Sequence, residues 1–217
     1  MLEAGDYCGF AIAIEPPGIV VITFNEPERL NGMTQPMKRD LVETLTQCQM
    51  EDQVRIVVFT GSGRAFSAGD DISGKPRTAA STLVPPIHRG HDHHIGTYEG
   101  LRVLSQPVNS AIRNLDKITI AAMNGVAIQT GFSLALACDF RIAARSARMG
   151  SATLRFALLP DEGGQYLLVQ HLGLSRTLDF LMRKRIVEAE EALELGLVNE
   201  VVDDEGLMER ALELARE

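Results

Sequence analysis

Apolar residues along the chain follow two kinds of pattern, short continuous runs and runs spaced three to four residues apart. The continuous runs are rich in β-branched residues and end at turn residues. They lie at 18–27 (GIVVITFNEP), 55–63 (RIVVFTGSG) and 118–127 (ITIAAMNGVA). Such runs are typical of buried strands. Two later segments, FRIAARSA at 140–147 and LVNEVV at 197–202, continue the set of predicted strands.

The spaced pattern first occurs between the first two runs, in the segment that begins at Thr34. Apolar residues recur at helical spacing there, Thr34 is suited to cap the helix, and a proline follows early. A strand, a helix and a strand in this order predict a parallel pair joined by a helical crossover. Repetition of the order predicts an α/β fold. After Gly163, helices are predicted in 164–185, 188–196 and 204–217.

Segment 73–98 has no sustained period and is rich in Pro, Gly, Ser and Thr. A loop of this length is typical of a lid or of a partly disordered segment. It carries four of the five histidines, at positions 88, 91, 93 and 94. A metal site needs rigid ligands with outer support, which this segment does not offer, so no metal is predicted.

Length and composition narrow the class of protein. A chain of 217 residues fits one domain with a substantial core. Three cysteines exclude an even disulfide framework, and the net charge of −8 disfavours a nucleic-acid surface. No apolar stretch approaches the ~20 residues of a membrane span. We therefore predict a cytoplasmic protein without metal, nucleic-acid or membrane partners.

Two segments could accept a developing negative charge. GRAFSAGDDISG at 63–74 has small residues that let the backbone approach a ligand, but it lacks the spacing of a P-loop or a dinucleotide-binding turn. In MNGVAIQTGFSLALACDF at 123–140, a strand leads to an apolar helix that we predict to begin near Gly131. The N–H groups at that helix start point outward at the positive end of its dipole.

A third segment, LLPDEGGQYLL at 158–168, places Asp161 and Glu162 between a proline and a glycine pair. From these residues alone, Asp161 as the cap of a helix beginning near Glu162 is favoured over Asp161 as a catalytic base.

Together these segments, with VVITFNEPERLNGM and EALELGLVNEVV, resemble the enoyl-CoA hydratase/isomerase, or crotonase, superfamily in order and spacing over nearly the whole chain. The resemblance implies a spiral of ββα units with two roughly perpendicular sheets. It also implies homotrimers or hexamers, and acyl-CoA thioester substrates, so that coenzyme A enters as part of the substrate and no separate cofactor is needed. We expect a core at 1–196 and the start of a C-terminal helical region at 197–217.

The resemblance also assigns binding roles. Backbone N–H groups of Asp70 and Thr130 are expected to hold the thioester oxygen and to stabilise the enolate formed from it. Coenzyme A and substrate are expected to lie near the residues Arg29, Leu30, Ala68, Asp71 and Ile72, with Arg29 as a partner for a phosphate.

Two departures from the family pattern concern acid and base. Hydratases of this family carry two glutamates, and Ser133 and Thr153 stand at those positions here as expected pocket lining. Neither hydroxyl has carboxylate-like basicity. The family's isomerases carry one acid/base after the proline, which corresponds to Asp161. We expect it in a dry pocket with a raised pKa beside Phe132, Phe156, Leu158 and Leu159, and Glu162 exposed in the first helical turn.

The sequence thus predicts an isomerase that shifts a double bond in an unsaturated acyl-CoA by a 1,3 proton transfer. Two alternatives remain open. The first is an acyl-CoA binder without catalysis. The second is a thioester hydrolase or hydratase that uses Asp161 or Glu162 to activate water.

Overall fold

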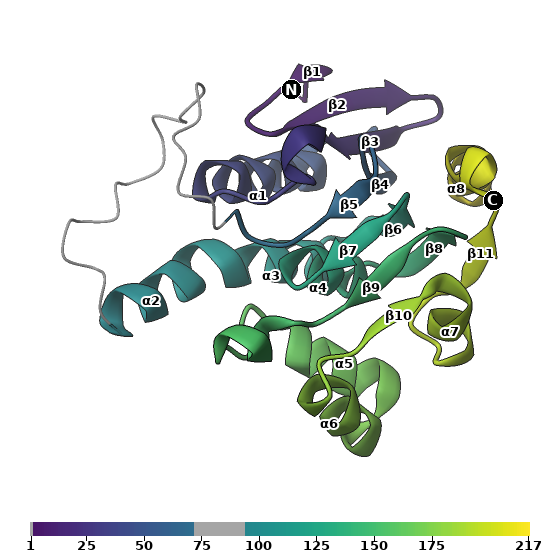
Figure 1. Cartoon of the computed structure of the whole chain (residues 1–217). Helices are drawn as coiled ribbons and strands as arrows, with labels where there is room; N and C mark the ends of the chain where they lie inside the picture. The colour runs from purple at the N-terminus through teal and green to yellow at the C-terminus, as the bar shows by residue number, and fades with distance from the viewer. Residues whose placement is uncertain (1, 72–93) are drawn as a thin grey trace.

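The computed structural model describes residues 2–71 and 94–217 as two β-sheets with helices packed around them (Figure 1). The larger sheet has the order β1-β2-β3-β4-β6-β8-β11. Its strands are β1 (Gly5–Asp6), β2 (Phe10–Glu15), β3 (Ile19–Phe24), β4 (Ile56–Gly61), β6 (Ile118–Met123), β8 (Phe140–Ala144) and β11 (Glu200–Val202). The strands from β3 to β11 run parallel. The predicted α/β class is confirmed.

The smaller sheet has the order β10-β9-β7-β5. Its strands are β5 (Ala65–Ser67), β7 (Val126–Ile128), β9 (Arg148–Gly150) and β10 (Ile186–Glu188). In each of the pairs β4/β5, β6/β7 and β8/β9, the first strand joins the larger sheet and the second joins the smaller one. A helical segment follows each pair. The chain therefore repeats a ββα unit, as the resemblance implied.

The helices fill the spaces between and around the sheets. They are α1 (Gln35–Met50), α2 (His94–Gly100), α3 (Gln106–Arg113), α4 (Thr130–Ala137), α5 (Gly164–Leu172), α6 (Leu174–Met182), α7 (Ala189–Glu194) and α8 (Leu207–Arg216). Short turns of helix occur at η1 (Pro27–Arg29), η2 (Leu101–Ser105), η3 (Thr153–Phe156) and η4 (Asp204–Gly206). Within the described ranges, no helix combines the length and the apolar character that crossing a membrane requires.

The core lies between the larger sheet and its helices. Thr34 caps α1 as predicted, because its Oγ1 accepts the Met37 N–H at 3.4 Å. Buried Leu41 and Leu45 then face the sheet side of α1. Every residue of α4 is buried, and α8 packs against β6 and β8. In Figure 1, α5 and α6 lie at the end of the molecule opposite β1 and β2.

The single strand predicted over 118–127 is wrong, because the chain breaks there into β6 and β7 of different sheets. The Asn124 side chain forms the corner: it accepts the Gly61 N–H at 3.0 Å and donates to the carbonyl oxygens of Gly63 and Ala65. A Cβ on Gly125 would lie 2.3 Å from the Arg64 oxygen. The tight corner therefore requires both residues of the Asn-Gly pair.

The predicted loop at 73–98 is also too long at its C-terminal end, since α2 begins at His94. Leu104, Val108 and Ile112 are buried at intervals of four residues, which anchors the helical stretch that begins with α2. The remainder of the expected lid, with the histidines at 88, 91 and 93, lies outside the described residues. Likewise the helical stretch predicted at 164–185 is two helices that separate at Gly173.

We predict that Gly131→Ala destabilises the protein. A Cβ at Gly131 would lie 2.3 Å from the backbone oxygen of Ser67, where α4 meets the end of β5. Overpacking of this kind costs about 1–3 kcal/mol. Gly206→Ala is the matched control, because no atom lies within 4 Å of its added Cβ. Equal urea midpoints for the two variants would contradict the prediction.

Candidate active site

A cleft of about 830 Å³ lies where the ends of β5 and β7, the start of α4 and the segment before α5 converge. Apolar and polar side chains share its lining, as in most small-molecule sites. The lining includes Met33, Lys38, Ala68, Asp70, Asp71, Leu101, Ser105, Ile128, Gln129, Thr130, Thr153, Phe156, Leu158, Leu159, Asp161 and Glu162. The predicted oxyanion residues Asp70 and Thr130 and the predicted base Asp161 therefore share one cleft.

The turn that carries Asp70 is held by backbone hydrogen bonds on both sides. The Ala68 N–H donates to the Leu30 oxygen at 2.9 Å, and the Asp71 N–H donates to the Met33 oxygen at 2.9 Å. No backbone acceptor among the described residues pairs with the Asp70 N–H. This N–H remains available to a ligand.

The second amide belongs to Thr130, the first residue of α4. A first helical residue has no acceptor for its N–H within the helix. The two amides lie close together, since a Cβ on Gly69 would be 3.7 Å from the Thr130 nitrogen. The start of α4 also adds the positive end of its dipole. The arrangement suits an oxygen that gains negative charge.

Asp161 is half-buried and lines the same cleft. It is not a helix cap, because α5 begins at Gly164 and its N-cap residue is Gly163. In the described residues, no other side chain hydrogen-bonds to its carboxylate. Burial raises the pKa of Asp161 and the charge of Asp70 adds to this, against the opposing effects of its own backbone N–H and of Lys38. A partly desolvated carboxylate without a side-chain partner can accept a proton.

Glu162 is not exposed, contrary to the sequence-based expectation. Glu162 is 3% exposed, and it precedes α5 in the chain instead of lying in the first turn of that helix. Ser133 Oγ donates to Glu162 Oε1 at 2.5 Å, and Gln129 Nε2 donates to both Glu162 oxygens at 3.0 and 2.9 Å. Burial raises the pKa of Glu162, while the Ser133 hydrogen bond lowers it. The adjacent acidic residues thus have different environments.

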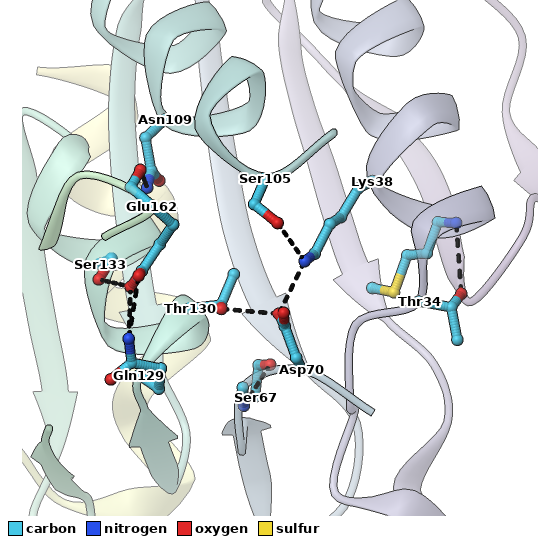
Figure 2. Close-up of polar contacts among 12 residues, drawn as sticks. Thr34, Lys38, Ser67, Asp70, Ser105, Asn109, Gln129, Thr130, Ser133 and Glu162 are labelled. Atoms are coloured by element: carbon cyan, nitrogen blue, oxygen red, sulfur yellow. Dashed lines mark hydrogen bonds and ion pairs between the residues drawn. The ribbon is translucent and has the colours of Figure 1, made fainter. Parts of the chain in front are cut away.

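A second polar cluster surrounds the Asp70 side chain, as Figure 2 shows. The buried Lys38 ammonium lies 2.8 Å from Asp70 Oδ1 and donates to Ser105 Oγ at 2.8 Å. Thr130 Oγ1 also donates to Asp70 Oδ1, at 2.7 Å. The Lys38 charge offsets the charge of the carboxylate of Asp70, a residue whose N–H is one of the two candidate oxyanion donors.

Some of the remaining predicted site residues line the cleft, and others lie outside its lining. Thr153 lines the cleft, and Phe156, Leu158 and Leu159 line its apolar side although each is exposed. Ser133 is 2% exposed and lies beneath the cleft as a partner of Glu162, not as lining. Phe132 is in the core, where it stacks on Phe180, and it is not among the residues that line the cleft.

The expected coenzyme A residues lie beside the Asp70 turn. Leu30 is half-buried in the left-handed region with φ 52°, and its oxygen holds Ala68. Arg29 Nη1 pairs with Asp71 Oδ2 at 3.0 Å and keeps 28% of its side chain exposed. A phosphate partner role for Arg29 stays a prediction. Ile72 lies outside the described residues.

Sequence reasoning did not assign a role to Gln129 or Lys38. Lys38 is on the cleft side of an amphipathic helix, a placement that helical spacing alone could have suggested. Gln129 stands where the resemblance implies a glycine run, and its backbone, with φ 50° and ψ −114°, has a conformation that favours glycine. Within residues 2–71 and 94–217, no group of three or more potential ligands is placed to hold a metal ion.

The chain as a whole is similar to proteins of one known family. The family model of enoyl-CoA hydratase/isomerase matches residues 15–217. The chain is 35% identical over 210 residues to a 1,2-epoxyphenylacetyl-CoA isomerase from Escherichia coli (strain K12). The match covers 95% of this chain and 75% of that protein.

Some solved structures that are similar to this chain are named hydratases, and others are named isomerases. An enoyl-CoA hydratase from Bacillus anthracis is 30% identical with a TM-score of 0.84, covering 96% of this chain and 76% of its own. A monofunctional enoyl CoA isomerase from M. smegmatis is 34% identical with a TM-score of 0.75, covering 96% and 83%. The overall fold therefore does not separate hydratase from isomerase, and the side chains in the cleft must do so.

Proposed function

The chain belongs to the enoyl-CoA hydratase/isomerase family of enzymes, which act on acyl-CoA thioesters, and we propose that it is an isomerase that moves a double bond within an unsaturated acyl-CoA. The observation that carries this proposal is the contrast between the two carboxylates of the cleft. Among the described residues, no other side chain hydrogen-bonds to the Asp161 carboxylate, whereas the Glu162 carboxylate is buried and accepts hydrogen bonds from Gln129 and Ser133.

In the proposed reaction, the thioester oxygen of a 3-enoyl-CoA accepts the N–H groups of Asp70 and Thr130. The Asp161 carboxylate removes a proton from C2, and the electrons pass to the thioester oxygen as a dienolate. Asp161 then returns the proton to C4, which leaves the double bond between C2 and C3. No atom is gained or lost, and one carboxylate serves as base and then as acid. The two amides stabilise this oxygen more strongly once it carries the negative charge of the dienolate.

Hydration is the second candidate, favoured by one observation, namely that Glu162 lines the cleft as a second carboxylate. A hydratase of the usual kind needs carboxylates free to orient and activate water. Ser133 and Thr153 stand at those positions, and both oxygens of Glu162 already accept hydrogen bonds. The engaged state of Glu162 therefore supports isomerisation over hydration.

Asp161→Asn is expected to lower the turnover of 3-enoyl-CoA to 2-enoyl-CoA by about 10²–10⁴-fold, because the amide cannot accept the C2 proton. The measurement is the rise of the conjugated thioester absorbance with a series of 3-enoyl-CoA chain lengths. Glu200→Gln is the matched control, since this carboxylate lies on β11 and pairs with Arg210 away from the cleft. Retention of wild-type turnover in Asp161→Asn would remove the proposed base.

The rate should depend on pH through Asp161. The base acts when ionised, and burial raises its pKa, so kcat/KM falls as pH decreases through a value above the ~3.9 of a free aspartate. The nearby Lys38 charge lowers the pKa of Asp161. Lys38→Met is therefore expected to move this acidic limb to higher pH. A pH–rate profile whose limb stays in place in Lys38→Met but disappears in Glu162→Gln would assign the titration to Glu162 instead.

A further inference from the structure

Gln129 holds an unusual backbone conformation at a critical place. It directly precedes Thr130, whose N–H is one of the two candidate oxyanion donors. Its φ of 50° and ψ of −114° lie in a region that residues with a side chain rarely adopt and that glycine adopts without a steric penalty. Such a conformation persists only where surrounding contacts fix it. The Thr130 amide direction therefore depends on what holds Gln129.

The side chain of Gln129 is held at both ends of its amide. Nε2 donates to both oxygens of Glu162, at 3.0 and 2.9 Å, and Oε1 accepts from Ser151 Oγ at 2.9 Å. Figure 2 shows Glu162 pointing from its own segment toward Gln129 and Ser133. The bonds to an ionised carboxylate are charge-assisted and stronger than neutral ones. Gln129 is thus fixed by two segments that follow it in the chain.

Glu162 is itself fixed from several directions. Ser133 Oγ donates to its Oε1 at 2.5 Å, and Asn109 Nδ2 donates to its backbone oxygen at 3.0 Å. Gly164 leaves the necessary space, since a Cβ there would lie 2.2 Å from Ser133 Oγ. Glu162 and Ser133 are 3% and 2% exposed. Gln129, Ser133 and Glu162 therefore form a rigid hydrogen-bonded cluster, in which Ser133 and Glu162 are enclosed by the protein and not solvated.

We propose that Glu162 is a positioning residue that clamps Gln129 and thereby aims the Thr130 N–H at the thioester oxygen. This inference rests on the proposed function for the use of that N–H in turnover. It gives the buried carboxylate a role other than proton transfer, which belongs to Asp161. It also explains how a residue with a side chain can occupy a position where the backbone favours glycine.

The test is a double-mutant cycle of Glu162→Gln and Gln129→Gly. Glu162→Gln removes the charge and one of the two acceptors for Gln129. It should lower kcat about 10–100-fold, the scale of a misplaced catalytic group, with KM changed less than about three-fold. In the Gln129→Gly background the clamp has no partner, so adding Glu162→Gln should change kcat by less than about two-fold. Ser151→Ala, which loosens only the far end of the Gln129 amide, should give a smaller loss than Glu162→Gln.

A second readout separates this proposal from the proposed function. Acetoacetyl-CoA, a 3-oxoacyl thioester, forms an enolate that absorbs in the near ultraviolet, and an intact oxyanion site should favour that enolate without any turnover. Glu162→Gln should weaken the enolate signal of the wild type about ten-fold, and less than two-fold in the Gln129→Gly background. If the wild type converts no 3-enoyl-CoA but this pattern holds, the proposed function fails and the clamp stands.

Two results would overturn the clamp. One is a loss from Glu162→Gln that is equal in both backgrounds, which would assign Glu162 a direct chemical or a merely structural role. The other is full wild-type kcat and enolate signal in Glu162→Gln. Thermal melting of each variant accompanies the cycle, and Ser151→Ala supplies the comparison if Glu162→Gln does not fold. Equal kcat and enolate signal in Ser151→Ala and wild type would then count against the clamp.

Discussion

The parallel pairing of β5 with β7 is the constraint on which the candidate site depends. Ala65 pairs with Val126, and Ser67 pairs with Ala127. Because parallel strands end at the same edge, the turn after β5 and the helix start after β7 leave the sheet side by side. The two amides of Asp70 and Thr130 come from different ββα units, yet this pairing brings them together. The close approach of Gly131 to the Ser67 oxygen sets how near the two segments can come.

Two separate polar clusters hold the Asp70 and Glu162 carboxylates near these amides. Lys38 and Thr130 Oγ1 hold the Asp70 carboxylate, while Gln129 and Ser133 hold the Glu162 carboxylate. Asp161 lines the same cleft, and no other side chain of the described residues hydrogen-bonds to its carboxylate. In the proposed reaction, this division leaves the Asp161 carboxylate for proton transfer and gives the other two a supporting role.

The sequence predicts those parts of the fold and site that depend on local pattern. β3, β4 and β8, the Thr34 cap and the start of α4 follow from periodicity and capping residues. The break between β6 and β7 does not, because the corner at Asn124 depends on contacts with residues near Gly61 that lie sixty positions away. The burial of Glu162 could not be predicted from the sequence either, because an acidic residue just before a helix is usually a solvated cap. Its partners, Gln129 and Ser133, come from another unit of the fold.

The most direct test of the account is incubation of 3-enoyl-CoA substrates with the protein in heavy water, followed by mass spectrometry. The account predicts conversion to the 2-enoyl-CoA with deuterium entering the acyl chain on prolonged incubation, with no addition of water and no release of free coenzyme A. A product heavier by one water, free coenzyme A, or a substrate that binds but neither isomerises nor exchanges would contradict it.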